Sequence, residues 1–195
     1  SNLDAKLREE TRIEIKRIQS ELGVTTIYVT HDQTEAMAMS DRIMVMEHGI
    51  VKQIGTPQEI YHRPNNRFVA TFIGETNLLT MKVTLIEDNI ITVTNEKGLE
   101  LQGLTENLAP GLQVSTGDEI YVSVRPEAFE GGPGENTVTG IVELIEFTGL
   151  SVNYFIKWND TTLKAMIISR GTAILQAGDM IELHIPKQNI YFLGE

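Results

Sequence analysis

After Gly74 the sequence changes from helix-like periodicity to a series of short runs rich in β-branched and aromatic residues. Glycine, proline and asparagine separate these runs, as expected of strands joined by turns. The predicted strands are residues 78–86, 90–94, 99–102, 118–124, 137–147, 152–158, 161–168, 180–185 and 189–193. Many short strands with this punctuation are typical of a small barrel or sandwich, so residues 76–195 are predicted to form an all-β domain.

Residues 1–75 show a different pattern, in which helical stretches alternate with strands. The predicted elements are helices at 4–22, 32–40, 57–62 and 66–73, a hairpin of strands at 42–47 and 50–54, and a strand at 24–30. The run VTTIYVT at 24–30 has no polar alternation, which predicts a strand that is covered on both faces. A sheet normally contains several such strands, and residues 1–75 supply only one. This unit is therefore interpreted as the end of an α/β domain.

Composition narrows the function classes. The net charge is -11, and residues 76–195 account for -9 of it, with 7 Lys/Arg against 16 Asp/Glu. This balance disfavours nonspecific nucleic-acid binding, which depends on cationic side chains. The chain has no cysteine and no histidine pair at ligand spacing, so neither a disulfide nor a metal site is predicted. The charged N-terminus and the absence of an apolar run of about 18 residues predict neither a signal peptide nor a membrane span.

His31 directly follows the predicted strand, in the stretch VTHDQTEAM at residues 29–37. Ligands of open α/β sheets bind at the carboxyl ends of strands, and a histidine there can donate a hydrogen bond to an anion. The position alone also fits a histidine that fills a strand end or caps the next helix, and without further residues that structural interpretation is favoured.

The surrounding residues favour the functional interpretation. The ordered segments SNLD (1–4), TTIYVTHDQTEAM (25–37) and SDRIMVMEHGIVKQIGTPQEIYHRPNNRFVATFIGETN (40–77) resemble the second half of an ABC importer ATPase subunit of the maltose, polyamine and sulfate type. The segment VRPE at 124–127 resembles the signature of the TOBE domain that such subunits carry. The resemblance implies an α/β fragment, the end of the P-loop ABC ATPase domain, at 1–75, followed by an all-β OB-like TOBE barrel at 76–195.

The resemblance also implies roles for individual residues. His31 matches the switch histidine of the H-loop, which contacts the γ-phosphate of ATP. Asp32 and Gln33 belong to the same motif as supporting residues. The D-loop, which lies at the dimer interface near the opposite ATP site, is matched by Ser1, Asn2, Leu3 and Asp4.

The TOBE signature residues have a structural interpretation. Pro126 fixes its φ angle and lacks a backbone donor, which suits a corner of the chain. Arg125 and Glu127 are expected to pair across this corner. The domain itself is interpreted first as a regulatory and dimerisation module, and second as a site for a small regulatory ligand such as an oxyanion.

The family pattern is incomplete in this chain. The phosphate loop G-x-x-x-x-G-K-[ST] does not occur in its 195 residues, nor do the signature helix, the glutamine loop and the catalytic glutamate. The chain therefore resembles a fragment of a longer subunit. We expect ATP and Mg²⁺ to be cofactors of the full-length protein, and we expect the fragment to bind no cofactor and to hydrolyse no ATP.

Partners follow from the same resemblance. It implies a homodimer through the ATPase and TOBE domains, association with transmembrane permease subunits, and a location on the cytoplasmic face of the membrane. The segment GETN at 74–77 is similar to the polyamine-type subgroup. One alternative is a stand-alone OB-fold module that binds a ligand or nucleic acid, although the acidic charge argues against nucleic acid. Another is a pure interaction module that dimerises through its β domain.

Overall fold

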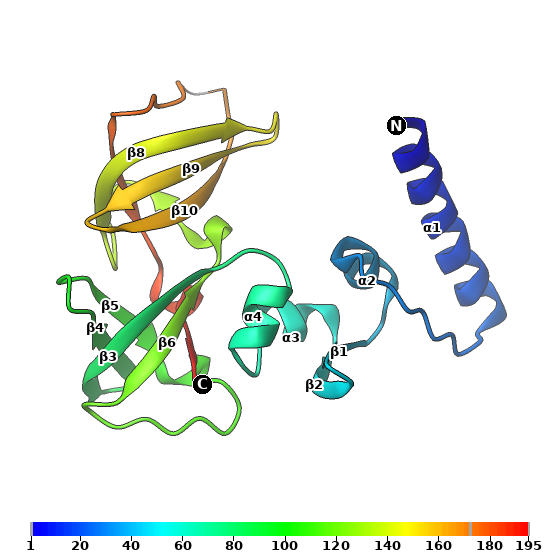
Figure 1. Cartoon of the computed structure of the whole chain (residues 1–195), viewed down its shortest axis with the longest axis horizontal. Coiled ribbons are helices and arrows are strands. Elements are labelled where there is room, and N and C mark those ends of the chain that lie inside the picture. Colours follow the sequence, from blue (N-terminus) through cyan, green and yellow to red (C-terminus); the bar gives the residue numbers. More distant parts are fainter. Residues whose placement is uncertain (1, 172, 195) are drawn as a thin grey trace. The chain divides into compact units, whose positions relative to one another are not determined.

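The computed structural model describes residues 2–171 and 173–194, and the chain divides into two compact units (Figure 1). The first unit comprises residues 1–62 and the second residues 63–195. Helices dominate the first unit, whereas the second is built mainly from antiparallel strands. Within the described ranges, no helix has both the length and the apolar character needed to cross a membrane.

The first unit contains three of the four helices predicted in residues 1–75, together with the predicted hairpin. Its elements are α1 (Asn2–Leu22), α2 (Gln33–Met39), β1 (Ile43–Glu47), β2 (Ile50–Gly55) and α3 (Pro57–His62). Gly23 ends α1 with a φ of 62°, and its N–H donates to the carbonyl of Gln19 at 3.0 Å. His48 and Gly49 form the hairpin turn with φ angles of 49° and 80°, a conformation that glycine adopts without strain.

The strand predicted at residues 24–30 is wrong for this structure, because the segment forms an extended connection without strand pairing. Ile27 is 89% exposed and Val29 is 88% exposed. A strand needs a neighbour for its backbone hydrogen bonds, and among the described residues none pairs with this segment. The apolar stripe of α1 is likewise uncovered, with Leu7 61% exposed and Leu22 67% exposed.

The second unit begins with a short helix, α4 (Arg67–Phe72), and continues as two five-stranded sheets. The first sheet has the order β12-β6-β3-β4-β5, and the second has the order β10-β9-β8-β11-β7. The strands are β3 (Asn77–Glu87), β4 (Ile90–Thr94), β5 (Glu100–Leu104), β6 (Glu119–Val124), β7 (Glu130–Gly131), β8 (Val138–Phe147), β9 (Ser151–Trp158), β10 (Thr161–Ile168), β11 (Met180–His184) and β12 (Tyr191–Leu193). The prediction of a β-rich second half is confirmed, and the structure adds its division into two sheets.

The two sheets exchange strands. After β6 the chain passes through the 3-10 turn Pro126–Ala128 into β7, which pairs with β11 of the second sheet. After β11 it passes through the 3-10 turn Lys187–Asn189 into β12, which pairs with β6 of the first sheet. The first half of this unit (β3 to β7) therefore contributes its last strand to the second sheet, and the second half (β8 to β12) contributes its last strand to the first sheet. The two halves form one interlocked body.

The exchange follows an internal repeat. Val83 in β3 and Val142 in β8 each precede a β-bulge. The backbone of each valine is hydrogen-bonded to a turn that contains an aspartate, Asp118 for Val83 and Asp179 for Val142. In the first half the side chain of Asp118 accepts from the Ser115 N–H at 2.8 Å, and in the second half Asp179 accepts from the Gln176 N–H at 2.7 Å. The segments TGDEI (116–120) and AGDMI (177–181) carry this repeat in the sequence.

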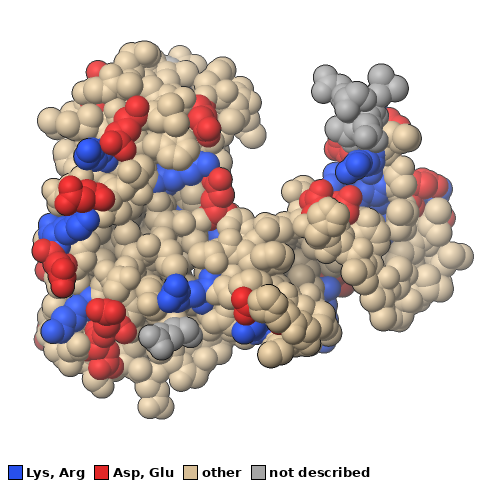
Figure 2. All heavy atoms as spheres, in the orientation of Figure 1, with Lys and Arg blue, Asp and Glu red and all other residues tan. Residues whose placement is uncertain are grey.

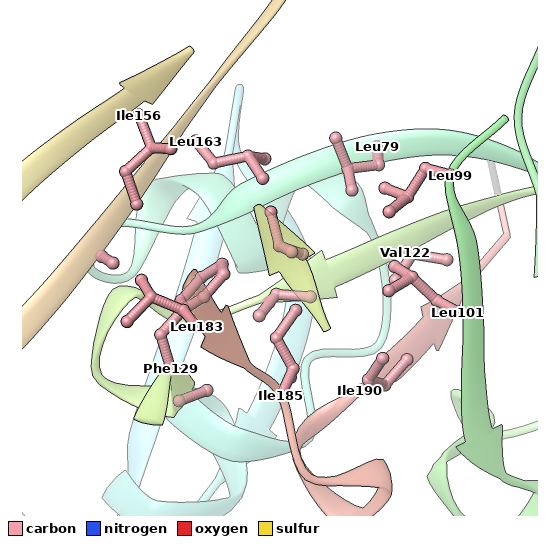
Figure 3. Packing of buried hydrophobic residues seen from close by; sticks show 14 of the residues in the cluster. Leu79, Leu99, Leu101, Val122, Phe129, Ile156, Leu163, Leu183, Ile185 and Ile190 are labelled. Carbon is pink, nitrogen blue, oxygen red and sulfur yellow. The ribbon is translucent and has the colours of Figure 1, made fainter. Parts of the chain in front are cut away.

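One hydrophobic cluster contains buried side chains from both sheets (Figure 3). Leu101 and Val122 enter it from the first sheet, while Ile156 and Leu163 enter it from the second. Each of these four side chains is at most 2% exposed. Complete burial of such a side chain stabilises a fold by about 1.5–3 kcal/mol, so this shared core fixes the sheets relative to one another.

The compact units divide at a different place from the predicted domains. Residues 63–75, which the sequence assigns to the first domain, belong to the second compact unit. Ala70 of α4 is fully buried in a cluster with Tyr191 and Leu193, which explains this assignment. The compact units do not test where the ATPase domain ends, so the boundary between residues 75 and 76 stays a prediction.

Candidate functional site

A network of hydrogen bonds surrounds His31 at the start of α2. Asp32 is the N-cap of this helix, and its Oδ1 accepts from the N–H groups of Thr34 at 2.8 Å and Glu35 at 3.2 Å. The Asp32 N–H donates in turn to the Thr30 hydroxyl oxygen at 2.9 Å. The two residues that flank His31 are therefore both tied into the corner before α2.

Glu35 completes this network from the first turn of α2. Its Oε2 accepts hydrogen bonds from the hydroxyls of Thr30 at 2.8 Å and Tyr28 at 3.1 Å. The hydrogen bond to the Glu35 carboxylate raises the pKa of Tyr28 above its ordinary value of 10.0, and desolvation acts in the same direction. Sequence reasoning missed Glu35 and Thr30, although an acid three residues after an N-cap aspartate is a recognisable signal.

His31 itself is exposed, and within the part of the chain that the structure describes its imidazole has no hydrogen bond or ion pair. Its backbone is thus held on both sides while its ring nitrogens remain accessible. An exposed imidazole at a fixed corner can donate a hydrogen bond to an anionic oxygen. The corner also places Gln33 as the first residue of α2, next to Asp32.

The predicted D-loop residues lie at the N-terminal end. Ser1 lies outside the described residues, while Asn2 begins α1 and Leu3 and Asp4 follow in its first turn. The side chains of these three residues are also outside the described part of the chain. Their predicted place at a dimer interface therefore stays a prediction.

The predicted TOBE signature forms a corner in the second unit. Pro126 opens the 3-10 turn after β6 and is buried, while Glu127 is exposed. Arg125 is 9% exposed, and its Nη1 donates to the backbone carbonyls of Ala70 at 3.1 Å and Glu75 at 2.9 Å. The guanidinium therefore binds α4 and the segment that follows it to the β sheets. The predicted pairing of Arg125 with Glu127 stays a prediction.

Two asparagines hold the sheets together in the same way. The Asn77 carboxamide accepts from the Lys164 N–H at 2.7 Å and donates to the Lys164 carbonyl at 2.9 Å and the Val124 carbonyl at 3.1 Å. The Asn136 carboxamide accepts from the Gln102 N–H at 2.6 Å and donates to the carbonyls of Gln102 and Ile185, both at 2.9 Å. Lys164 and Gln102 lie in the edge strands β10 and β5, so each asparagine occupies hydrogen-bonding groups that an edge strand would otherwise expose.

Among the described residues, no group of three or more His, Cys, Asp or Glu side chains could hold a metal ion. The candidate site is therefore the His31 corner, with Asp32, Thr30 and Glu35 as its neighbours.

Comparison with known proteins finds similar sequences over nearly the whole chain. The family model described as "TOBE domain" matches residues 122–193. The spermidine/putrescine import ATP-binding protein PotA of Rubrobacter xylanophilus is 41% identical over 195 residues, which covers 98% of this chain and 51% of that protein. The xylose/arabinose import ATP-binding protein XacK of Haloferax volcanii is 38% identical over 203 residues, covering 100% of this chain and 51% of that protein.

A third relative extends the range of solutes in this group. The maltose/maltodextrin import ATP-binding protein MalK of Photobacterium profundum is 36% identical over 189 residues, covering 95% of this chain and 50% of that protein. The chain thus spans about half the length of the curated relatives that it matches.

Among solved structures, the cytoplasmic molybdate-binding protein ModG with molybdate bound has a TM-score of 0.55 and 18% identity. The match covers 61% of this chain and 96% of that protein. At this identity the likeness concerns the fold alone, and it supports an OB-like architecture for the β-rich part. The family model and the curated relatives show that the chain carries a TOBE domain and is similar over nearly its whole length to ABC importer ATP-binding subunits.

Proposed function

We propose that the chain is the C-terminal half of the ATP-binding subunit of an ABC importer, in which ATP hydrolysis drives solute uptake. In this proposal residues 1–75 end the nucleotide-binding domain, and residues 76–195 form the TOBE regulatory and dimerisation domain. The sequence likeness to import ATP-binding proteins over nearly the whole chain supports it. The observation that carries it is the corner at residues 30–35, where His31 is exposed while both of its neighbours are hydrogen-bonded.

His31 acts in this proposal as a hydrogen-bond donor to the γ-phosphate. ATP supplies the phosphoryl group that is transferred, and Mg²⁺ neutralises charge on its oxygens. Phosphoryl transfer depends mainly on positioning and on donors aimed at the oxygens where charge develops. An imidazole N–H at a fixed corner meets that need without acting as a nucleophile. Asp32 supports it by capping α2, and Gln33 belongs to the same corner.

The uncovered apolar surface of the first unit supports a larger α/β domain. Ile27 and Val29 are almost fully exposed, although β-branched residues of this kind favour a covered sheet. In the proposal, segment 24–30 pairs with strands of the nucleotide-binding domain, and Leu7 and Leu22 of α1 pack against the same domain. The D-loop residues 1–4 then face a second copy of the subunit at its ATP site.

The solute and the membrane partners are part of the same proposal. The subunit works as a homodimer on the cytoplasmic face of the membrane, bound to transmembrane permease subunits. Relatives of comparable identity are named for spermidine/putrescine, maltose and xylose/arabinose import, so the solute requires a direct test. A polyamine is the first solute to examine, because PotA aligns over 98% of the chain at 41% identity.

The charge distribution argues against the nucleic-acid-binding alternative. Figure 2 shows Lys and Arg side chains interspersed with Asp and Glu on the visible face, with no continuous basic surface. Residues 76–195 carry a net charge of -9, whereas an OB-fold that binds single strands uses a basic groove with stacking aromatics.

Hydrogen exchange of segment 24–30 tests whether this chain completes a larger domain. The 195-residue chain is compared with the longer polypeptide encoded by its reading frame. We expect the backbone amides of 24–30 to exchange rapidly in the chain alone and to be protected in the longer protein. Equal, rapid exchange in both proteins would refute the assignment of residues 1–75 to an ATPase domain.

A further inference from the structure

We propose that Glu35 is a positioning residue that fixes His31 for contact with the γ-phosphate. The inference rests on the proposed function of His31, and it assigns to Glu35 a role that the sequence motif did not suggest. Its basis is that a single carboxylate oxygen of Glu35 binds two hydroxyls from the segment before His31, at 2.8 and 3.1 Å.

The Thr30 hydroxyl connects Glu35 to the residue that follows His31. Its hydroxyl donates to Glu35 at 2.8 Å, and the same oxygen accepts from the N–H of Asp32 at 2.9 Å. The chain on the N-terminal side of His31 is thereby joined to the chain on its C-terminal side. The His31 peptide is enclosed in a small loop of hydrogen bonds that begins at Glu35 in α2 and ends at its N-cap, Asp32.

A capping role alone does not explain this geometry, as α3 shows. In α3, Glu59 lies three residues after the N-cap position Thr56 and reaches back to the Thr56 N–H at 2.8 Å. Glu35 has the same spacing from the N-cap Asp32, yet the Asp32 N–H is bound by Thr30 instead. The Glu35 carboxylate is thus directed to the far side of His31, toward Thr30 and Tyr28.

The result is a fixed backbone and an exposed imidazole that makes no hydrogen bond to any residue that the structure describes. Such an arrangement places an imidazole donor without occupying its nitrogens, which a γ-phosphate contact requires. Small displacements of a positioned group reduce catalysis strongly, and a shift of about 1 Å can cost roughly 100-fold in rate.

The first experiment measures backbone ¹⁵N order parameters in the 195-residue chain. Wild type is compared with Glu35→Ala, with Glu35→Gln, whose amide oxygen can still accept from both hydroxyls, and with the control Glu9→Ala on the exposed surface of α1. We expect order parameters near 0.85 for His31 and Asp32 in wild type, Glu35→Gln and the control, and values below about 0.6 in Glu35→Ala. Unchanged values in Glu35→Ala would overturn the proposal.

The second experiment measures ATP hydrolysis by the longer subunit. We expect Glu35→Ala to lower kcat by roughly 10- to 100-fold with KM for ATP changed by less than about 2-fold, and Glu35→Gln to retain the wild-type kcat. In a His31→Ala background, Glu35→Ala should cause no further loss, because it acts through His31. Additive losses in the double variant would show that Glu35 acts elsewhere and would overturn the proposal.

The two experiments separate this inference from the proposed function. If His31→Ala leaves kcat unchanged, the γ-phosphate role fails and the catalytic part of the Glu35 proposal fails with it. If His31→Ala abolishes turnover while Glu35→Ala changes neither the order parameters nor kcat, only the positioning role is refuted.

Discussion

The side chain of Asn77 in β3 binds both backbone polar groups of Lys164 in β10, at 2.7 and 2.9 Å. The contact joins the two sheets of the second unit and occupies hydrogen-bonding groups of an edge strand. Asn136 makes the equivalent contact with Gln102 in β5. This duplicated contact accompanies the exchange of β7 and β12 between the sheets, and both bind the two halves into one body.

Asn77→Ala is expected to lower the free energy of unfolding by about 1–3 kcal/mol, because the buried Val124 carbonyl and the Lys164 backbone lose their partner. Asn77 suits this test better than Asn136, whose φ of 50° would strain an alanine. Urea unfolding of the chain measures the change. The control Asn153→Ala, which removes one 3.5 Å contact to Glu146, should stay within about 0.5 kcal/mol of wild type. Equal losses in both variants would contradict the assigned role of Asn77.

Gly140→Ala is expected to destabilise the chain by about 1–3 kcal/mol through overpacking. A Cβ there would lie 2.5 Å from Ile156 Cγ2 and 2.6 Å from the Lys157 carbonyl oxygen. Gly131 is the matched control, since a Cβ at that position meets no atom within 4 Å. Thermal unfolding should show a lower Tm for Gly140→Ala and an essentially unchanged Tm for Gly131→Ala. A Tm for Gly140→Ala equal to that of wild type would refute the close packing of β8 on β9.

Arg125→Met should lower the free energy of unfolding of the second unit by about 1.5–3 kcal/mol, because charge-assisted hydrogen bonds to two carbonyls are lost. Limited proteolysis should then cut faster between Ala70 and Glu75, whose carbonyls the guanidinium holds. Arg170→Met, at an exposed position, controls for the loss of a positive charge. Unaltered cleavage of this segment in Arg125→Met would exclude a tethering role.

Tyr191 predicts how stability changes at alkaline pH. Its side chain is 8% exposed, and burial raises its pKa above the ordinary value of 10.0, with Arg63 opposing the shift. Because the pKa of Tyr191 is raised in the folded state, the neutral side chain makes its full contribution to the free energy of unfolding below the pKa of the unfolded state. This contribution is lost as the pH rises through the pKa of the folded state. The wild-type stability should therefore fall more steeply than that of Tyr191→Phe above about pH 10. Urea midpoints that run parallel for the two proteins across this range would contradict the prediction.

Local chemistry made parts of the fold predictable from the sequence. Thr56 and Glu59 identified the start of α3 because a capping box needs only neighbouring residues, and the structure contains both of its hydrogen bonds. The turn at His48-Gly49 and the stop at Gly23 followed from the same short-range rules. His31 could be singled out because its motif is contiguous in the sequence.

Long-range relationships were not predictable in the same way. The strand predicted at 24–30 is absent because β-propensity cannot supply a neighbouring strand. The contact of Asn77 with Lys164 joins residues 87 positions apart, and only the fold brings them together. The internal repeat was detectable from the segments at 116–120 and 177–181, whereas the strand exchange was not.

The most direct test of the proposed function is the steady-state ATPase activity of the longer subunit, with and without His31→Ala. We predict that the substitution lowers kcat by at least about 100-fold, as expected for the loss of one transition-state donor. KM for ATP should change by less than about 3-fold, and the control His62→Ala, at the exposed end of α3, should retain the wild-type kcat. A His31→Ala subunit that hydrolyses ATP at the wild-type rate would contradict the account.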